Sequence, residues 1–188
     1  MHFEHNIYTM IDYQKKTMLR DPENFDYETI KLEIESITST KIKQIVCLLY
    51  ASGARVSELI KIKKTDINLQ MINKKQYLII RHEVLKKRGK TQYVQAPVSL
   101  QEQWLIEPIQ SLVKNSPTDT LVPLHRATVY RKVLKATGIN PHGFRKLRAT
   151  HLSKYHGFRE AQLVKFFGWQ DFRPASVYVK ANLEDIAY

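Results

Sequence analysis

Six positions of the 188-residue chain carry side chains whose types and order fit one kind of chemistry. In chain order they are Arg55, Lys90, His142 and Arg145 of a His-Gly-Phe-Arg quartet, Trp169 and Tyr178. A guanidinium can hold two phosphate oxygens in its planar fork, and a lysine or histidine can move a proton. A tyrosine hydroxyl becomes a nucleophile once neighbouring groups take its proton. These are the parts needed for a protein hydroxyl to attack a phosphodiester without a metal ion.

The balance of charged residues points to an anionic partner. The 30 Lys and Arg residues outnumber the 18 Asp and Glu residues and give a formal net charge of +12. Such an excess favours a polyanion through electrostatic steering and counterion release. Charge alone leaves open the alternative of a soluble basic protein with no such partner.

Cysteine and histidine usage predicts no disulfide, no metal and no cofactor. The single cysteine, Cys47, lies within the apolar run 45–49, which favours a buried thiol over a nucleophile. The histidines and acids show no compact cluster with the spacing of a metal site. No run approaches the ~20 apolar residues of a membrane span. We therefore expect a cytoplasmic, DNA-associated protein in a reducing compartment.

Hydrophobic periodicity and turn residues predict a mainly α protein with a small antiparallel β-hairpin or three-stranded sheet, an α+β class. The predicted strands are 76–82 and 91–96, the second stopping at Pro97, with a cationic hairpin tip at 86–89. Predicted helices cover 40–52, 128–137 and 159–167, and two more begin at Ser57 and at His142. Another helix is opened by a Ser99-x-x-Glu102 capping box and is expected to be kinked or split at Pro108. A last helix near Pro174 is expected to carry Tyr178.

Residues 1–25 and 26–188 are predicted to form different parts of the chain. The first stretch is polar, contains the turn Asp21-Pro22-Glu23-Asn24, and is expected to be an N-terminal extension or linker remnant. A short amphipathic helix there would place Ile7, Met10 and Ile11 on one face. We expect residues 26–188 to form a single catalytic domain.

The first arginine lies in the segment Leu48-Leu49-Tyr50-Ala51-Ser52-Gly53-Ala54-Arg55-Val56-Ser57-Glu58-Leu59. Because Arg55 follows a helix-stopping glycine, its side chain can leave the scaffold while its backbone stays anchored. Glu58 lies three residues further on and can orient a catalytic group. The alternative interpretation is a surface Arg–Glu pair at helical spacing.

The second arginine lies in Pro141-His142-Gly143-Phe144-Arg145-Lys146-Leu147-Arg148-Ala149-Thr150-His151-Leu152. On a helix His142 and Arg145 are three residues apart and point the same way, so one phosphate can touch both. Phe144, Leu147, Ala149 and Leu152 are expected on the inner face. A purely structural histidine remains the alternative.

Trp169 and Tyr178 complete the series near the end of the chain. Trp169 follows Gly168 and can donate one indole N–H or simply pack in the core. Tyr178 is one of ten tyrosines, and only its position nine residues after Trp169 singles it out from competitors such as Tyr155 and Tyr188.

These segments resemble the catalytic domain of the tyrosine recombinases, the phage integrase family. The similarity runs from about Asp26 to Tyr178. It is concentrated in the two arginine segments, in the apolar stretch ending in Gly168 and Trp169, and in the spacing to the final tyrosine. The resemblance implies the fold of that catalytic domain and a site-specific recombinase that needs neither metal nor ATP.

The resemblance also implies a role for each residue. Tyr178 would attack the scissile phosphate and form a 3′-phosphotyrosyl link while Arg55 and Arg145 clamp the non-bridging oxygens. His142 would take the tyrosyl proton or hold the phosphate, and Lys90 would protonate the leaving 5′ oxygen. Lysine rivals at the hairpin tip and further basic side chains are expected to contact DNA: Lys86, Lys87, Arg88, Lys146 and Arg148.

The expected partner is double-stranded DNA, with a homotetramer on two DNA sites during recombination and a monomer when free. Members resembling this family usually carry an additional N-terminal DNA-clamping domain, which residues 1–25 cannot supply. Two alternatives remain from the sequence: DNA relaxation of the type IB topoisomerase kind, and a DNA-binding module with an inactive site.

Overall fold

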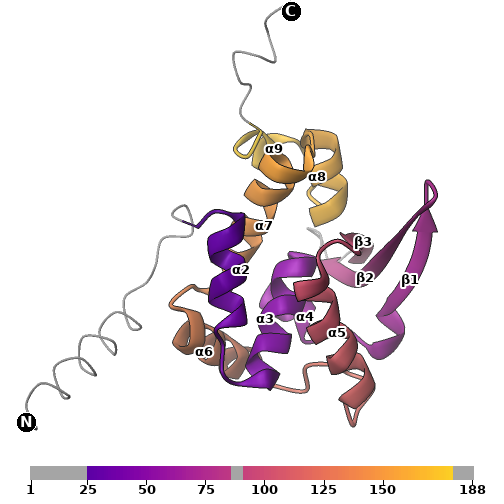
Figure 1. Ribbon diagram of the computed structural model, residues 1–188. Coiled ribbons are helices and arrows are strands. Elements are labelled where there is room, and N and C mark those ends of the chain that lie inside the picture. The colour runs from indigo at the N-terminus through magenta and orange to yellow at the C-terminus, as the bar shows by residue number, and fades with distance from the viewer. Residues whose placement is uncertain (1–24, 86–90, 180–188) are drawn as a thin grey trace, which may run out of the picture.

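The computed structural model describes residues 25–85 and 91–179, and these form a mainly helical body with a small sheet at one side (Figure 1). The helices are α2 (Tyr27–Glu35), α3 (Thr40–Ser52), α4 (Val56–Leu59), the short 3-10 helix η2 (Lys64–Asp66), α5 (Gln103–Asn115), α6 (Arg126–Thr137), α7 (Pro141–His156), α8 (Glu160–Phe167) and α9 (Arg173–Ser176). The strands are β1 (Ile67–Ile72), β2 (Lys75–Leu85) and β3 (Thr91–Ser99). The predicted fold class is confirmed.

Helix α3 forms the centre of the core, where it contacts α2, α5, α6, α7 and β3. Every residue from Gln44 to Ser52 is buried, so the helix is covered on all sides rather than on a single stripe. Cys47 is among these residues, and burial raises the pKa of its thiol to about 12. The structure therefore confirms the prediction of a buried Cys47 that is not a nucleophile.

The three strands pair antiparallel in the order β1-β2-β3. The third strand does not stop at Pro97 as predicted, because this residue pairs with Ile79 and the strand continues to Ser99. Proline is tolerated there since β3 is an edge strand of the described sheet and one of its sides carries no ladder. Helix α8 packs against β3, which brings the C-terminal part of the chain to the sheet.

Two glycines allow helix ends to lie close to neighbouring elements. Gly53 ends α3 at φ 60°, and Gly168 ends α8 at φ 63°, both in the left-handed region. A Cβ on Gly53 would overlap the ring of Phe167, and a Cβ on Gly168 would lie 2.7 Å from Cγ1 of Val94. The end of α3 can therefore approach Phe167 of α8, and the end of α8 can approach the sheet, only because both residues lack a side chain.

A buried polar cluster ties α2, α5 and α7 together, and it corrects two predictions. Arg148 is fully buried, and its guanidinium donates to both carboxylate oxygens of Glu102 at 2.6 and 2.9 Å. Tyr27 donates a further bond to the same carboxylate at 3.0 Å. Glu102 therefore forms no capping box with Ser99, since its side chain is used inside the core. Arg148 is a core residue and does not contact DNA from this position.

The histidine that follows in the same helix is also structural. His151 is buried, with Nδ1 2.7 Å from the Tyr50 hydroxyl and Nε2 3.0 Å from the Phe25 carbonyl. Burial lowers the pKa of His151 to about 4, so its ring is neutral at pH 7.

The other predicted helices are present with small changes at their ends. Helix α5 runs through Pro108 without being split. Helix α9 is only four residues long, so Tyr178 lies in the turn that follows it rather than on the helix as predicted. Across residues 25–85 and 91–179, no helix is long and apolar enough to cross a membrane.

Candidate active site

Arg55 occupies the N-cap position of α4 and is held by a carboxylate of its own helix. Its backbone N–H donates to Glu58 Oε2 at 2.7 Å and its Nη1 donates to Oε1 at 2.8 Å. The Glu58 side chain is 3% exposed, whereas that of Arg55 is 46% exposed. Glu58 therefore anchors the base of an arginine whose guanidinium reaches solvent.

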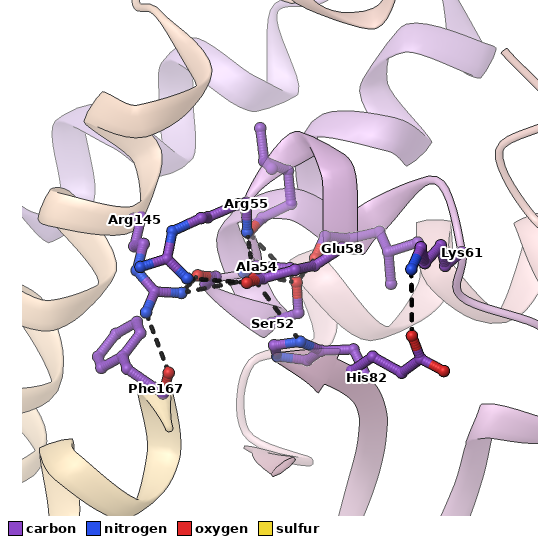
Figure 2. Close-up of polar contacts among 12 residues, drawn as sticks. Ser52, Ala54, Arg55, Glu58, Lys61, His82, Arg145 and Phe167 are labelled. Carbon is purple, nitrogen blue, oxygen red and sulfur yellow. Dashed lines mark hydrogen bonds and ion pairs between the residues drawn. The ribbon is translucent and has the colours of Figure 1, made fainter. Parts of the chain in front are cut away.

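Arg145 comes from α7 and its guanidinium lies beside the same carboxylate, as Figure 2 shows. Nη1 donates to the Gly53 carbonyl, Nη2 donates to the Phe167 carbonyl at 3.0 Å, and Nη1 is 3.9 Å from Glu58 Oε2. Burial and the neighbouring Arg55 lower the pKa of Arg145 to about 10. It stays charged at pH 7, and a bound anion would relieve the repulsion between the two guanidiniums.

An aromatic stack connects Arg145 to the end of the chain. The guanidinium lies 4.8 Å from the centroid of the Phe167 ring. Phe167 stacks on Trp169 with centroids 4.8 Å apart, and Trp169 stacks on Tyr178 with centroids 5.9 Å apart and planes at 12°. A phenolate at Tyr178 would raise the pKa of Arg145. The stack therefore connects the second arginine to Tyr178.

A cavity of about 290 Å³ lies over this arrangement. Its polar lining consists of Arg55, Ser57, Arg126, Tyr130, His142 and Arg145. The volume corresponds to about ten water molecules at ~30 Å³ each, so it can hold a phosphate group together with part of a sugar. A larger cavity of about 710 Å³ between the sheet and α8 contains none of these residues and lies apart from this chemistry.

His142 lies in the first turn of α7 and lines this cavity, as the spacing to Arg145 predicted. Partial burial, followed by the charges of Arg145, Lys146 and Arg55, lowers its pKa. The imidazole is therefore neutral at pH 7 and can accept a proton.

Sequence reasoning missed two residues of α6, Arg126 and Tyr130. Both are exposed and both line the cavity. Their spacing of four residues places them on one helix face, a signal that was available but not distinctive on a helix with four other exposed or partly exposed polar side chains. Phe167 was predicted only as the last residue of the helix 159–167, and its position between Arg145 and Trp169 depends on contacts between distant segments.

The remaining predicted residues divide into two groups. Lys146 is exposed on α7 next to the cavity-lining residues, and Trp169 is partly buried in the stack. The hairpin residues Lys86, Lys87, Arg88 and Lys90 lie outside the described residues. In the described part of the chain, no three histidine, cysteine, aspartate or glutamate side chains gather to hold a metal ion.

The chain has the features of a basic, mainly helical domain in which two arginines and a histidine line one cavity and an aromatic stack connects the second arginine to Tyr178. The family model of the phage integrase family matches residues 23–184. The chain therefore belongs to the phage integrase family, the tyrosine recombinases. No curated protein sequence matches it.

Solved structures of recombinases share the fold. The crystal structure of XerA recombinase is 20% identical with a TM-score of 0.64, and the match covers 86% of this chain and 61% of that one. XerH site-specific recombinase bound to its difH substrate is 16% identical with a TM-score of 0.62, covering 90% and 53%. A lambda integrase dimer bound to a COC′ core site is 19% identical with a TM-score of 0.57, covering 80% and 46%. The chain thus spans about half to three-fifths of the length of these proteins.

Proposed function

We propose that this chain is the catalytic part of a site-specific recombinase that cleaves and rejoins DNA through a 3′-phosphotyrosyl intermediate. The observation that carries the proposal is the continuous series from Arg55 through Glu58 to Arg145, and from there through the aromatic stack to Tyr178. It combines two anchored cations, a nucleophile and a cavity of suitable size.

The proposed reaction assigns bond making and bond breaking to named atoms. Tyr178 Oη forms a bond to phosphorus while the bond from phosphorus to the 5′ oxygen breaks, and Arg55 and Arg145 stabilise the charge that develops on the non-bridging oxygens. His142 accepts the phenol proton. Lys90 remains our proposed donor of a proton to the leaving 5′ oxygen. Attack by a 5′ hydroxyl on the phosphotyrosine reverses the step and restores the phosphodiester, so no ATP is consumed.

Double-stranded DNA is the proposed partner. The net charge of +12 supports it, and XerH and lambda integrase were solved as complexes with DNA. We further propose a homotetramer on two DNA sites, a monomer when free, and action in the cytoplasm.

The proposal is tested with a pool of nicked duplexes made from the DNA that surrounds the encoding gene. A nick close to the cleavage site lets the cleaved end diffuse away and traps the covalent adduct. We expect a denaturation-resistant protein–DNA band, with the nucleotide attached to Tyr178 in peptide mapping. Tyr178→Phe should abolish the band, and Tyr155→Phe, which changes an exposed tyrosine of α7, should retain it.

Other outcomes would assign a different function. An adduct that persists in the Tyr178→Phe variant would refute the nucleophile. Relaxation of supercoiled plasmid without sequence preference would indicate topoisomerase-like activity. Intact binding with no adduct on any duplex would indicate an inactive DNA-binding module.

A further inference from the structure

His82 of β2 is a buried histidine whose hydrogen bonds are not satisfied. Its side chain is 0% exposed, yet neither Nδ1 nor Nε2 has a hydrogen-bond partner of normal geometry among the described residues. Buried polar atoms are nearly always paired, so an imidazole with two unpaired nitrogens calls for an explanation. Simple core packing is better served by an apolar side chain of similar size.

The ring lies next to Glu58 of the arginine site (Figure 2). Nδ1 lies 3.9 Å from Oε2 of Glu58 on α4, too long for a hydrogen bond. The charge of Arg145 from α7 lowers the pKa of the ring, whereas the backbones of Glu83 and of Ser52 at the end of α3, which lie outside normal hydrogen-bond geometry, raise it. Glu58 therefore contacts His82 as well as both arginines.

Glu58 depends on the arginines for its hydrogen bonds. It accepts one bond from the Arg55 backbone and one from the Arg55 guanidinium, and Arg145 adds a longer ionic contact. A phosphate in the cavity would draw both guanidiniums toward its own oxygens. Glu58 would then lose a donor while 3% exposed, with little access to water as a replacement.

We propose that His82 is a positioning residue that donates from Nδ1 to Glu58 when Arg55 and Arg145 bind a phosphate. The distance of 3.9 Å would close to hydrogen-bond length by a small movement of the carboxylate. His82 would keep Glu58 paired and in place, so that the arginines can turn without losing their common anchor. The inference rests on the proposed function because it requires both arginines to bind a phosphate.

The electrostatics of the ring fit this role. Burial lowers the pKa of His82, Arg145 lowers it further, and Glu58 opposes the shift. The ring is thus neutral at pH 7 and able to keep a proton on Nδ1 as a donor. When a phosphate neutralises the arginines, the charge of Glu58 acts on His82 with less competition. The pKa of His82 should therefore rise on phosphate binding.

The test follows three histidines in one NMR titration with inorganic phosphate. His142 lines the cavity and reports occupancy, and His151 is buried in the core cluster and reports global change. We expect phosphate to shift the ring signals of His142 and His82 together, to raise the pKa of His82, and to leave His151 unchanged. In Glu58→Gln, the His82 response should disappear.

Two substitutions separate positioning from packing. His82→Asn keeps an N–H near the position of Nδ1, and His82→Leu removes every donor at similar volume. We expect the Leu variant to bind phosphate roughly tenfold more weakly, the size of one lost charge-assisted hydrogen bond, and the Asn variant to stay within about threefold of wild type. Thermal unfolding establishes that both variants are folded.

Failure of the inference and failure of the proposed function give different results. A shift at His142 without any change at His82, or equal phosphate affinity in both His82 variants, overturns the positioning role alone. No shift at either histidine shows that the cavity does not bind phosphate and overturns both proposals. The covalent adduct on Tyr178 tests the nucleophile independently of either result.

Discussion

The buried pair of Arg148 and Glu102 gives the sharpest prediction about stability. Arg148→Met should remove the guanidinium that bonds both oxygens of this carboxylate, while the Tyr27 hydroxyl stays in place and the His156 ring remains 3.9 Å away. Since the Glu102 side chain is 4% exposed, water cannot replace the two lost bonds. Breaking a buried ion pair on one side typically costs about 3–5 kcal/mol. For a domain of this size that lowers Tm by on the order of 10 °C.

The assay compares thermal unfolding with DNA binding measured by fluorescence anisotropy at a temperature where each variant is folded. Arg148→Met should lose stability but keep the DNA affinity of the wild type. Lys146→Ala, which removes an exposed cation two residues earlier, should weaken DNA binding and change stability by no more than ~0.5 kcal/mol. The double variant Arg148→Met/Glu102→Gln should regain part of the lost stability, because no charge remains buried without a partner.

One result would refute this reasoning. If Arg148→Met kept its Tm and lost DNA affinity, the guanidinium would be a DNA contact, as the sequence first suggested, and the buried pair would not exist in solution.

Three further predictions concern the core, its titration and the cavity. Gly53→Ala and Gly157→Ala both place alanine at a positive φ, which costs about 1 kcal/mol of stability at each position. Urea unfolding should show a larger loss for Gly53→Ala, because the new Cβ would overlap the ring of Phe167, whereas no atom lies within 4 Å of a Cβ at position 157. Lowering the pH from 7.5 to 5 should reduce the free energy of unfolding by about 2 kcal/mol through His151. The ring has a pKa of 6.5 in the unfolded chain and about 4 in the folded protein, so only the unfolded chain takes up a proton in this range. The variant His151→Gln should lack this part of the pH dependence. Arg126→Ala should reduce the salt dependence of DNA binding by about one phosphate contact and lower the yield of covalent adduct. Arg131→Ala removes an equal charge from another face of α6 and should leave the adduct yield unchanged.

The local parts of the fold were predictable because they depend on neighbouring residues. The glycines that end α3, α6 and α8 are all in the left-handed conformation, and hydrophobic spacing identified the inner face of α7. The three residues of separation between His142 and Arg145 correctly placed both at one cavity. In each case, local geometry fixes the outcome.

The predictions that failed depended on partners far along the chain. Arg148 follows Arg145 by one helical turn and is equally basic, so nothing near it indicates that Glu102, 46 residues away, pairs with it in the core. The same pairing removed the predicted capping box at Ser99. His82 was not predicted as a site residue, because it lies in a strand-forming segment and only the folded chain brings it close to Glu58.

The aromatic stack also gives the molecule an optical property. The chain contains two tryptophans, Trp104 in the core cluster and Trp169 between Phe167 and Tyr178. The emission of an indole depends on the rings and charges against its face. A Trp104→Phe variant would therefore carry a single tryptophan, whose emission reports whether Tyr178 stays stacked on Trp169 when DNA is added. The stack thus gives the protein an intrinsic optical probe beside Tyr178.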